Sequence, residues 1–426
     1  MNSINKNKKI SECRKATKLR RENLVCKTYS CKIDKSHLSK RSIEFLRMCF
    51  LEAKWFVNDI LSSDSIFNSN YKKRIVTVLK DGNNPEQRQI SHLSSQIRQS
   101  LADKLKQDIF NLTKMKEKGI KVGKLKFKKE IKCLPLKQNR ITFRIIDSHY
   151  IQLQGNKKSI KIDGLDQIPI NSEIAKADLI HKAGNYYLKI TCFIPKEIRI
   201  KTGKSIGLDF GIETNVTTSD GDKFNICIPE PIRLRKLQRG KSSRKVKHSK
   251  NWTKKSELIA IEYEKMNNRR KDLKDKLVHK LTKEYDVICC QDENVKGWHQ
   301  GWFGRQVQHS CMGGIISDLK RKSETFIQVN KWYPSTQICH ICGNRQEVKL
   351  KDRIFICSAC DVKEDRDTHS AINILKEGLK SLPERVMGNP EHVKSPVELL
   401  TPTNLDTLLD SKLVVMNQEA TRFSWW

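Results

Sequence analysis

The sequence lacks the long apolar stretches that a membrane protein needs. No run approaches the roughly twenty apolar residues that span a bilayer, and we find neither a signal peptide nor a lipidation motif. Acidic residues are scarce as well, with 48 Asp and Glu against 83 Lys and Arg and a net charge of +35. We therefore expect no membrane partner. A polyanion such as nucleic acid best neutralises this charge.

The cysteines show little sign of a disulfide framework. Ten of the 14 are scattered, so we expect reduced, mostly buried thiols and a cytoplasmic protein. The other four form two Cys-x-x-Cys pairs, Cys339/Cys342 and Cys357/Cys360, separated by fourteen residues. This spacing is typical of a zinc ribbon, the alternative being four free thiols. A closed four-sulfur site has no open position, so we expect one structural Zn²⁺.

The first half of the chain predicts a β unit with a helical insertion. We expect the first twenty residues to be loosely ordered and a strand at Leu24–Ile33 to follow. Helical periodicity predicts one helix from an N-cap at Ser36 and a second over residues 90–112. Alternating patterns then predict several strands, at 125–128 with a lysine-lined face, 141–146, 151–153, 160–162 and 186–194.

The second half predicts an α/β unit. A strand at 205–211 places Asp209 opposite Ile206, Leu208 and Phe210, and Asp220-Gly221 indicates a hairpin. Residues 233–255 contain eleven Lys or Arg and no acid. This segment predicts phosphate contacts, the alternative being a solvated, flexible loop. Further patterns predict a long helix with Leu273, Leu277 and Leu281, a buried strand at 287–293, a helix spanning Val307 to Leu319, a strand at 326–329 and a helix after Asp367.

Three acids end separate elements of this second half: Asp209, Glu293 and Asp367. If the fold brings them together, their oxygens suit two Mg²⁺ ions that promote phosphodiester hydrolysis. A lone Asp at a strand end is more often a cap or a surface charge. The zinc ribbon and the basic segment nearby favour an enzyme that cuts nucleic acid.

These motifs resemble the TnpB family, transposon-encoded relatives of miniature type V CRISPR effectors. The resemblance rests on GLDFGIETNVTTSDG, the acids before Asn294-Val295-Lys296, the ribbon and DRDTHSAINIL, over roughly residues 200–380. It implies a RuvC-like nuclease of RNase H fold, guided by RNA to double-stranded DNA beside a short motif read by the protein. It assigns Asp209 as the first acid and Asp367 as the third.

The second acid departs from the family pattern. Family members commonly have Glu-Asp-x-Asn-Val-Lys, and Gln291 stands where that Glu is expected. Gln291 and Glu293 share a strand face while Asp292 points away, so we predict Glu293 as the second acid. Asp365 is the alternative to Asp367, or a cap. A neutral Gln291 keeps open a cleavage-deficient, RNA-guided DNA-binding protein that acts as a repressor.

Other residues are weaker candidates. Trp298, Trp302 and Phe303 suit either core packing or base stacking, and His299 and His309 suit structural roles or phosphate contacts. Basic residues on strands and in the basic segment are predicted to contact nucleic acid. They are Lys124, Lys126, Lys128, Arg144, Arg233, Arg235, Lys236, Arg239, Arg244, Lys245 and Lys247.

The predicted fold is a multidomain α/β chain: a RuvC-like nuclease with an inserted ribbon, preceded by a β-barrel-like wedge unit with an inserted helical recognition unit. The expected segments are a basic N-terminus and first wedge strand (1–35), the recognition unit (36–120), the wedge unit (121–200), the nuclease (201–333 and 364–380), the ribbon (334–363) and a weakly ordered tail (381–426). We expect an RNA-guided endonuclease, cytoplasmic and nucleoid-associated when bound. Monomer or homodimer stays open, and a transposase acting directly on DNA ends is a minor alternative.

Overall fold

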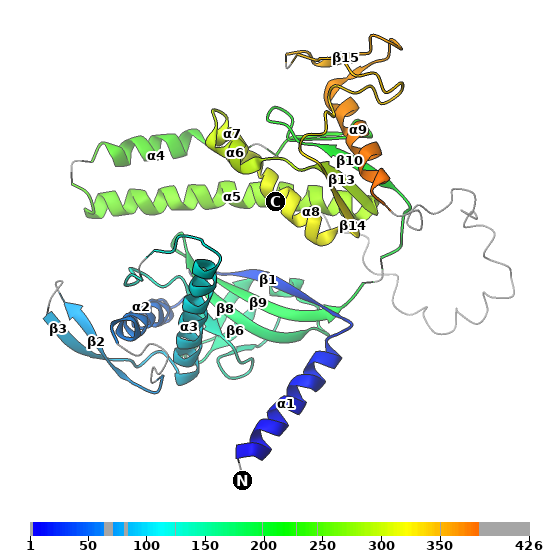
Figure 1. Cartoon of the computed structure of the whole chain (residues 1–426). Helices are drawn as coiled ribbons and strands as arrows, with labels where there is room; N and C mark the ends of the chain where they lie inside the picture. The colour runs from blue at the N-terminus through cyan, green and yellow to red at the C-terminus, as the bar shows by residue number, and fades with distance from the viewer. Residues whose placement is uncertain are drawn as a thin grey trace. The chain divides into compact units, whose positions relative to one another are not determined.

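The computed structural model describes residues 3–63, 71–80, 84–123, 125–197, 199–226, 228–244, 246–349 and 351–382. The chain divides into two compact units, Met1–Arg199 with Pro231–Lys265, and Ile200–Glu230 with Met266–Trp426 (Figure 1). The expected seven-segment division stays a prediction. Nearly all of the expected tail, from residue 383, lies outside the described residues.

A seven-stranded antiparallel sheet forms the centre of the first unit, in the order β4-β8-β9-β1-β7-β6-β5. Its strands are β1 (Leu24–Ile33), β4 (Cys133–Leu136), β5 (Phe143–Ile145), β6 (Tyr150–Leu153), β7 (Ile160–Asp163), β8 (Glu173–Lys182) and β9 (Asn185–Pro195). β1 and β9 confirm the predicted strands. Because β4 and β5 are edge strands, the hydrogen-bonded ladder of the described residues is open, unlike the expected barrel.

The helical insertion lies between β1 and the later strands, as predicted. Helices α2 (Lys40–Ser62) and α3 (Ser95–Glu117) share one hydrophobic core with the sheet, with Leu46, Phe56 and Leu101 buried. The predicted N-cap was wrong: the Ser39 side chain accepts the N–H of Ser42, so the helix begins at Lys40.

Three further expectations about the first unit were wrong. The first residues form helix α1 (Ser3–Arg20), since Lys, Arg, Glu and Ala favour helix without a core. A hairpin of β2 (Ile75–Lys80) and β3 (Asn84–Gln89) precedes α3, which starts five residues later than predicted. No strand forms at 125–128, where the Lys128 backbone bonds to the Asn58 side chain and not to a neighbouring strand.

The basic segment contains helix and is not a loop throughout. Helix α4 (Ile232–Ser242) is followed by α5 (Lys250–Glu284), whose first part also belongs to the first unit. Lys241 lies 4.2 Å from the Trp252 ring centre, and the Gln238 side chain donates to the Tyr263 hydroxyl at 2.7 Å. These contacts hold α4 against α5.

The second unit has a mixed five-stranded sheet in the order β12-β11-β10-β13-β14. Its strands are β10 (Ser205–Asp209), β11 (Val216–Thr218), β12 (Lys223–Phe224), β13 (Val287–Gln291) and β14 (Thr325–Val329). β10, β13 and β14 run parallel, while β11 and β12 are antiparallel. The predicted hairpin and the strands at 205, 287 and 326 are confirmed.

Helices cover both faces of this sheet. Ile206, Leu208 and Phe210 pack in one core with residues of α5 and of α8 (Met312–Lys322). Helix α9 (Arg366–Lys380) lies on the other face, where Ile374 packs with Val287 and Cys289 (Figure 1). Gly207 permits this approach, because a Cβ there would lie 2.1 Å from the Ala371 carbonyl oxygen.

The predicted helix from Val307 to Leu319 is two helices. Cys311, with a φ of 55°, separates α7 (Gly304–Ser310) from α8. Left-handed backbone cannot continue an α-helix, so the apolar spacing persists while the helix axis does not. A shorter helix, α6 (Val295–Gln300), precedes them, and Asn294 caps it by accepting the Gly297 N–H.

Candidate metal centre and basic surface

The three predicted acids of the second unit line one cavity of about 540 Å³. Asp209 is the last residue of β10, Glu293 lies two residues beyond β13, and Asp367 lies in the first turn of α9. β10 and β13 pair in parallel, with Leu208 opposite Cys290, so their carboxyl ends meet at one edge of the sheet. Three distant segments thus place carboxylates around one space.

The carboxylates repel one another in the absence of a cation. Asp209 is half-buried, and desolvation of its carboxyl group, together with the charges of Asp367 and Glu293, raises the pKa of Asp209 to about 8. Burial and the neighbouring Asp292 raise the pKa of Glu293 to about 7. Divalent cations that prefer oxygen ligands remove such repulsion, so the donor set fits Mg²⁺.

Gln291 has a structural role beside this cavity. Its buried side-chain amide donates to three backbone carbonyls, those of Asn330, Lys331 and Tyr333, at 3.3, 3.1 and 2.8 Å. Its carbonyl oxygen accepts the Ser335 hydroxyl at 3.1 Å, and Ser335 in turn accepts from Ser370 on α9 at 2.9 Å. Gln291 therefore joins β13, the loop before the ribbon and α9.

Asp292 and Asp365 lie apart from the cavity lining. Asp292 is exposed, and its carboxylate accepts a hydrogen bond from the Gln328 side-chain amide at 3.4 Å. Asp365 caps α9, accepting the Thr368 N–H at 3.1 Å, and pairs with Lys223 at 2.7 Å. This geometry matches the predicted strand face for Glu293 and the cap alternative for Asp365.

Some lining residues were not predicted. Arg366 lines the cavity and pairs with Asp367 at 3.2 Å, and its charge opposes the rise in the pKa of Asp209. The position of Arg366 between Asp365 and Asp367 was the sequence signal that could have predicted it as a site residue. Ser335 and Tyr333 also line the cavity, and no sequence pattern pointed to either residue.

The four ribbon cysteines converge. Their sulfur atoms all lie within 4.8 Å of one another, with Cys339 to Cys360 at 3.6 Å and Cys342 to Cys357 at 3.5 Å. Four sulfurs around one Zn²⁺ at about 2.3 Å are separated by about 3.8 Å, so the set fits a tetrahedral ion. The Ala359 N–H lowers the pKa of the Cys357 thiol to about 6, favouring thiolate. A hairpin of β15 (Ile354–Ile356) and β16 (Lys363–Asp365) carries the second pair toward α9.

The other predicted residues divide by exposure. Every described basic candidate is exposed: Lys126, Lys128, Arg144, Arg233, Arg235, Lys236, Arg239, Arg244 and Lys247. Arg233 also pairs with the buried Glu262 at 3.5 Å. Lys124 and Lys245 lie outside the described residues. An exposed basic helix α4 can contact phosphates, as predicted for this segment.

The aromatic and histidine candidates differ in their exposure and in their neighbours. Trp298 packs partly against the core of α5 and α8, and both Trp298 and Phe303 line the carboxylate cavity. Trp302 is fully exposed. His299 is exposed and His309 is half-buried, and neither belongs to a metal-type cluster among the described residues.

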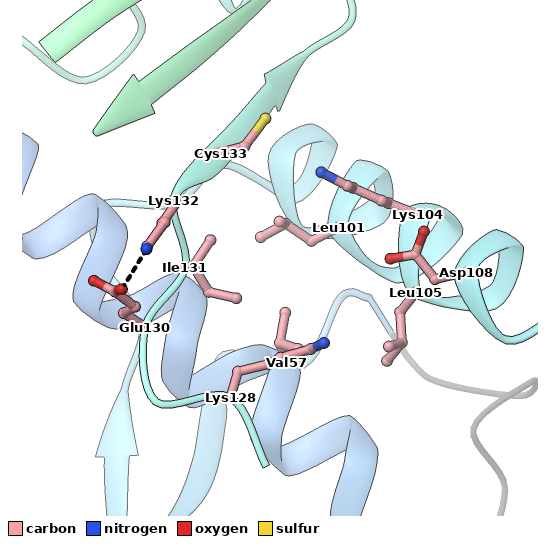
Figure 2. Close-up of a pocket in the computed structure, with 10 residues that line it drawn as sticks. All are labelled: Val57, Leu101, Lys104, Leu105, Asp108, Lys128, Glu130, Ile131, Lys132 and Cys133. Atoms are coloured by element: carbon pink, nitrogen blue, oxygen red, sulfur yellow. Dashed lines mark ion pairs between the residues drawn. The ribbon is translucent and has the colours of Figure 1, made fainter. Parts of the chain in front are cut away.

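Lys128 lines a second hollow, which lies in the first unit. About 250 Å³ in volume, it lies between α2, α3 and residues 128–133. Figure 2 shows Lys104, Lys128 and Lys132 around the apolar side chains of Val57, Leu101, Leu105 and Ile131. Lys132 pairs with Glu130 at 2.8 Å. Among the described residues that line this hollow, none belongs to a metal-type cluster.

Two protein families match the chain. Residues 193–299 match the family described as "Probable transposase" (OrfB_IS605), and residues 315–374 match the Cas12f1-like TNB domain. The first match includes Asp209 and Glu293, and the second includes the ribbon and Asp367. The two matches lie on neighbouring parts of the chain. Both matched segments therefore resemble proteins of the TnpB and Cas12f1 type.

Curated relatives match about half of the chain. A "Putative RNA-guided DNA endonuclease" of Streptomyces pristinaespiralis is 30% identical over 207 residues, 46% of this chain and 51% of the relative. TnpB-like protein L770 of Acanthamoeba polyphaga mimivirus is 26% identical over 263 residues, 54% and 46% of the two chains. The chain thus spans about half the length of these curated relatives.

One solved structure also matches the chain. The cryo-EM structure of a Cas12f1–sgRNA–target DNA complex matches with a TM-score of 0.48 and 12% identity, covering 83% of this chain and 99% of the other. Separately, no helix within the described residues is long and apolar enough to cross a membrane.

Proposed function

We propose that this chain is an RNA-guided DNA endonuclease with a RuvC-like, RNase H-type nuclease domain. One observation carries the proposal: Asp209, Glu293 and Asp367, from three distant segments, line one cavity, where desolvation and then the charges of the other two acids raise the pKa of Asp209. The mixed sheet with helices on both faces supports the nuclease fold. The relatives named as RNA-guided DNA endonucleases support the substrate and the guide.

In the proposed reaction the three carboxylates hold two Mg²⁺ ions. Bound Mg²⁺ supplies an activated water and stabilises the leaving oxygen of the phosphodiester. The carboxylates must lose their protons to bind, so metal binding near neutral pH releases protons from Asp209 and Glu293. Arg366 holds Asp367 by an ion pair, and Gln291 orients the loop that closes one side of the cavity.

The partners are a guide RNA and double-stranded target DNA. Exposed arginines and lysines of α4 bind phosphates, and base pairing with the guide reads the target sequence. In this proposal the first unit holds the heteroduplex and reads a short adjacent motif. The ribbon binds one structural Zn²⁺ and places α9, and the protein acts in the cytoplasm on nucleoid DNA.

A cleavage assay tests the proposal. Purify the protein with its co-expressed RNA, sequence that RNA, and incubate the complex with a matching plasmid in Mg²⁺. Wild type should cut, and Asp209→Asn should cut roughly a hundredfold more slowly or worse, because an amide cannot replace a metal-bound carboxylate. The exposed Asp272→Asn on α5 is the matched control and should cut normally.

Binding of the target without cutting by wild type would instead support the RNA-guided repressor. The neutral Gln291 is the observation that keeps this second function in view. Cutting that needs no RNA would contradict both functions.

A further inference from the structure

A second cluster of metal-type ligands lies beside the ribbon. His340 lies between Cys339 and Cys342, in a segment that we call the first knuckle. His340, Glu364 of β16 and His369 of α9 each place one ligand atom within 4.8 Å of the others. His340 Nε2 lies 2.9 Å and His369 Nδ1 lies 3.3 Å from the same oxygen, Glu364 Oε2. The His369 side chain is fully buried, and His340 is 12% exposed. This cluster shares no residue with the four-cysteine cluster.

The hydrogen bonds fix which nitrogen of His369 carries a proton. His369 Nε2 lies 2.9 Å from the backbone carbonyl oxygen of Ile338, which only accepts, so Nε2 must donate. The other ring nitrogen, Nδ1, faces a carboxylate oxygen of Glu364, which only accepts. A second ring proton or a metal ion satisfies this contact, and a third metal-type ligand atom, from His340, meets the other two here.

The geometry fits a divalent ion. Two ligand atoms at about 2.0 Å from a tetrahedral ion are about 3.3 Å apart, close to the 2.9 and 3.3 Å found here. Metal-binding histidines usually donate their second ring nitrogen to a backbone carbonyl, as His369 does. Stacking of His369 on Phe355, with ring centres 3.8 Å apart, holds the ring in this orientation.

We infer that His340, Glu364 and His369 bind a second Zn²⁺-type ion, separate from the four-cysteine site. Two imidazoles and one carboxylate favour Zn²⁺, Co²⁺ or Ni²⁺ over Mg²⁺, and three protein ligands leave one position for water. The ion joins the first knuckle to α9 at His369, two residues from Asp367. The ion therefore stabilises the position of α9, the helix that carries Asp367, and this role does not depend on the reaction that Asp367 serves.

Metal counting tests the inference without any activity assay. Load the full-length protein with Zn²⁺ in excess Mg²⁺, remove loosely bound metal, and measure zinc per chain by plasma mass spectrometry. Wild type should retain two zinc ions, and so should Asp209→Asn, which weakens the carboxylate cavity. Glu364→Gln and His340→Gln should each retain one. The exposed Glu347→Gln, in the same ribbon, should retain two.

Cobalt spectra identify which site is lost. In Glu364→Gln and His340→Gln, the thiolate-to-Co²⁺ absorption of the four-cysteine site should persist while half of the bound metal disappears. One zinc in wild type would overturn the inference, as would two zinc ions in both variants. Loss of both ions together with the thiolate absorption in both variants would also overturn it, because the cluster would then be only a part of the ribbon fold.

Discussion

At the residue scale, the carboxylate site depends on two positions: Gln291, where a Glu is usual, and Glu293, which supplies the carboxylate. The Gln291 side chain faces three backbone carbonyls, which an amide satisfies and a carboxylate repels. Glu293, two residues further along the chain, reaches the cavity. The neutral residue at the usual position is therefore compatible with a complete set of three acids.

Restoring the acid at position 291 should harm the protein. Gln291→Glu places a negative charge against buried carbonyl oxygens, so we expect a loss of about 1–3 kcal/mol in the free energy of unfolding and no gain in cleavage. Denaturant unfolding measures the first and a plasmid assay the second. The exposed Gln300→Glu is the control and should unfold like wild type. An unchanged stability and faster cutting by Gln291→Glu would show that residue 291 is a metal ligand.

The raised pKa of Asp209 predicts a pH-dependent stability in the metal-free protein. Its folded pKa of about 8 exceeds its ordinary 3.8, so between these values the folded state binds more protons than the unfolded state. The free energy of unfolding should therefore fall as pH rises through this window. Thermal melts in a chelator should show Asp209→Asn gaining on wild type between pH 5 and pH 8.

Two controls separate this effect from others. Asp272→Asn should follow wild type across the range, and Mg²⁺ should stabilise wild type more at pH 8 than at pH 6. Parallel melting curves for wild type and Asp209→Asn would mean that burial and charge do not perturb this carboxyl group.

At the scale of elements, the ribbon and α9 act together. The hairpin β15–β16 ends at Asp365, which caps the helix that carries Asp367. Cys357→Ser should remove the four-sulfur site and loosen this connection, lowering cleavage more than tenfold while guide RNA affinity changes less than about threefold. Cleavage rates and filter binding measure the two effects, with the exposed Cys13→Ser as control. Equal losses of cleavage and RNA binding would count against this placement.

Strong periodicity made some elements predictable. In β9 and β13 the apolar pattern spans the whole strand and the burial matches it, so even their bounds were close. The strand at 125–128 failed because an alternating pattern needs a partner strand, and Asn58 takes the Lys128 backbone instead. The partners of Gln291 are backbone groups about forty residues away, which no local pattern reveals.

At the scale of the whole molecule, the charge of +35 gathers in part on an ordered helix. Arg235, Lys236 and Arg239 are exposed on α4, so each can contact a phosphate. Replacing the three with alanine should lower RNA affinity and reduce the slope of log affinity against log salt by about 2–3, since each contact contributes about 0.7–0.9. Replacing Lys271, Lys276 and Lys283 of α5 gives a matched control. Equal changes in both variants would indicate diffuse attraction and no contact at α4.

The most direct test of the account measures cutting by Glu293→Gln. This variant keeps the size of the side chain and removes the charge that the account assigns to the second metal ligand. With equal RNA occupancy and an unchanged melting temperature, guided plasmid cleavage should fall roughly a hundredfold or more, while Asp292→Asn should cut like wild type. Normal cleavage by Glu293→Gln, or its loss in Asp292→Asn, would contradict the three-carboxylate site.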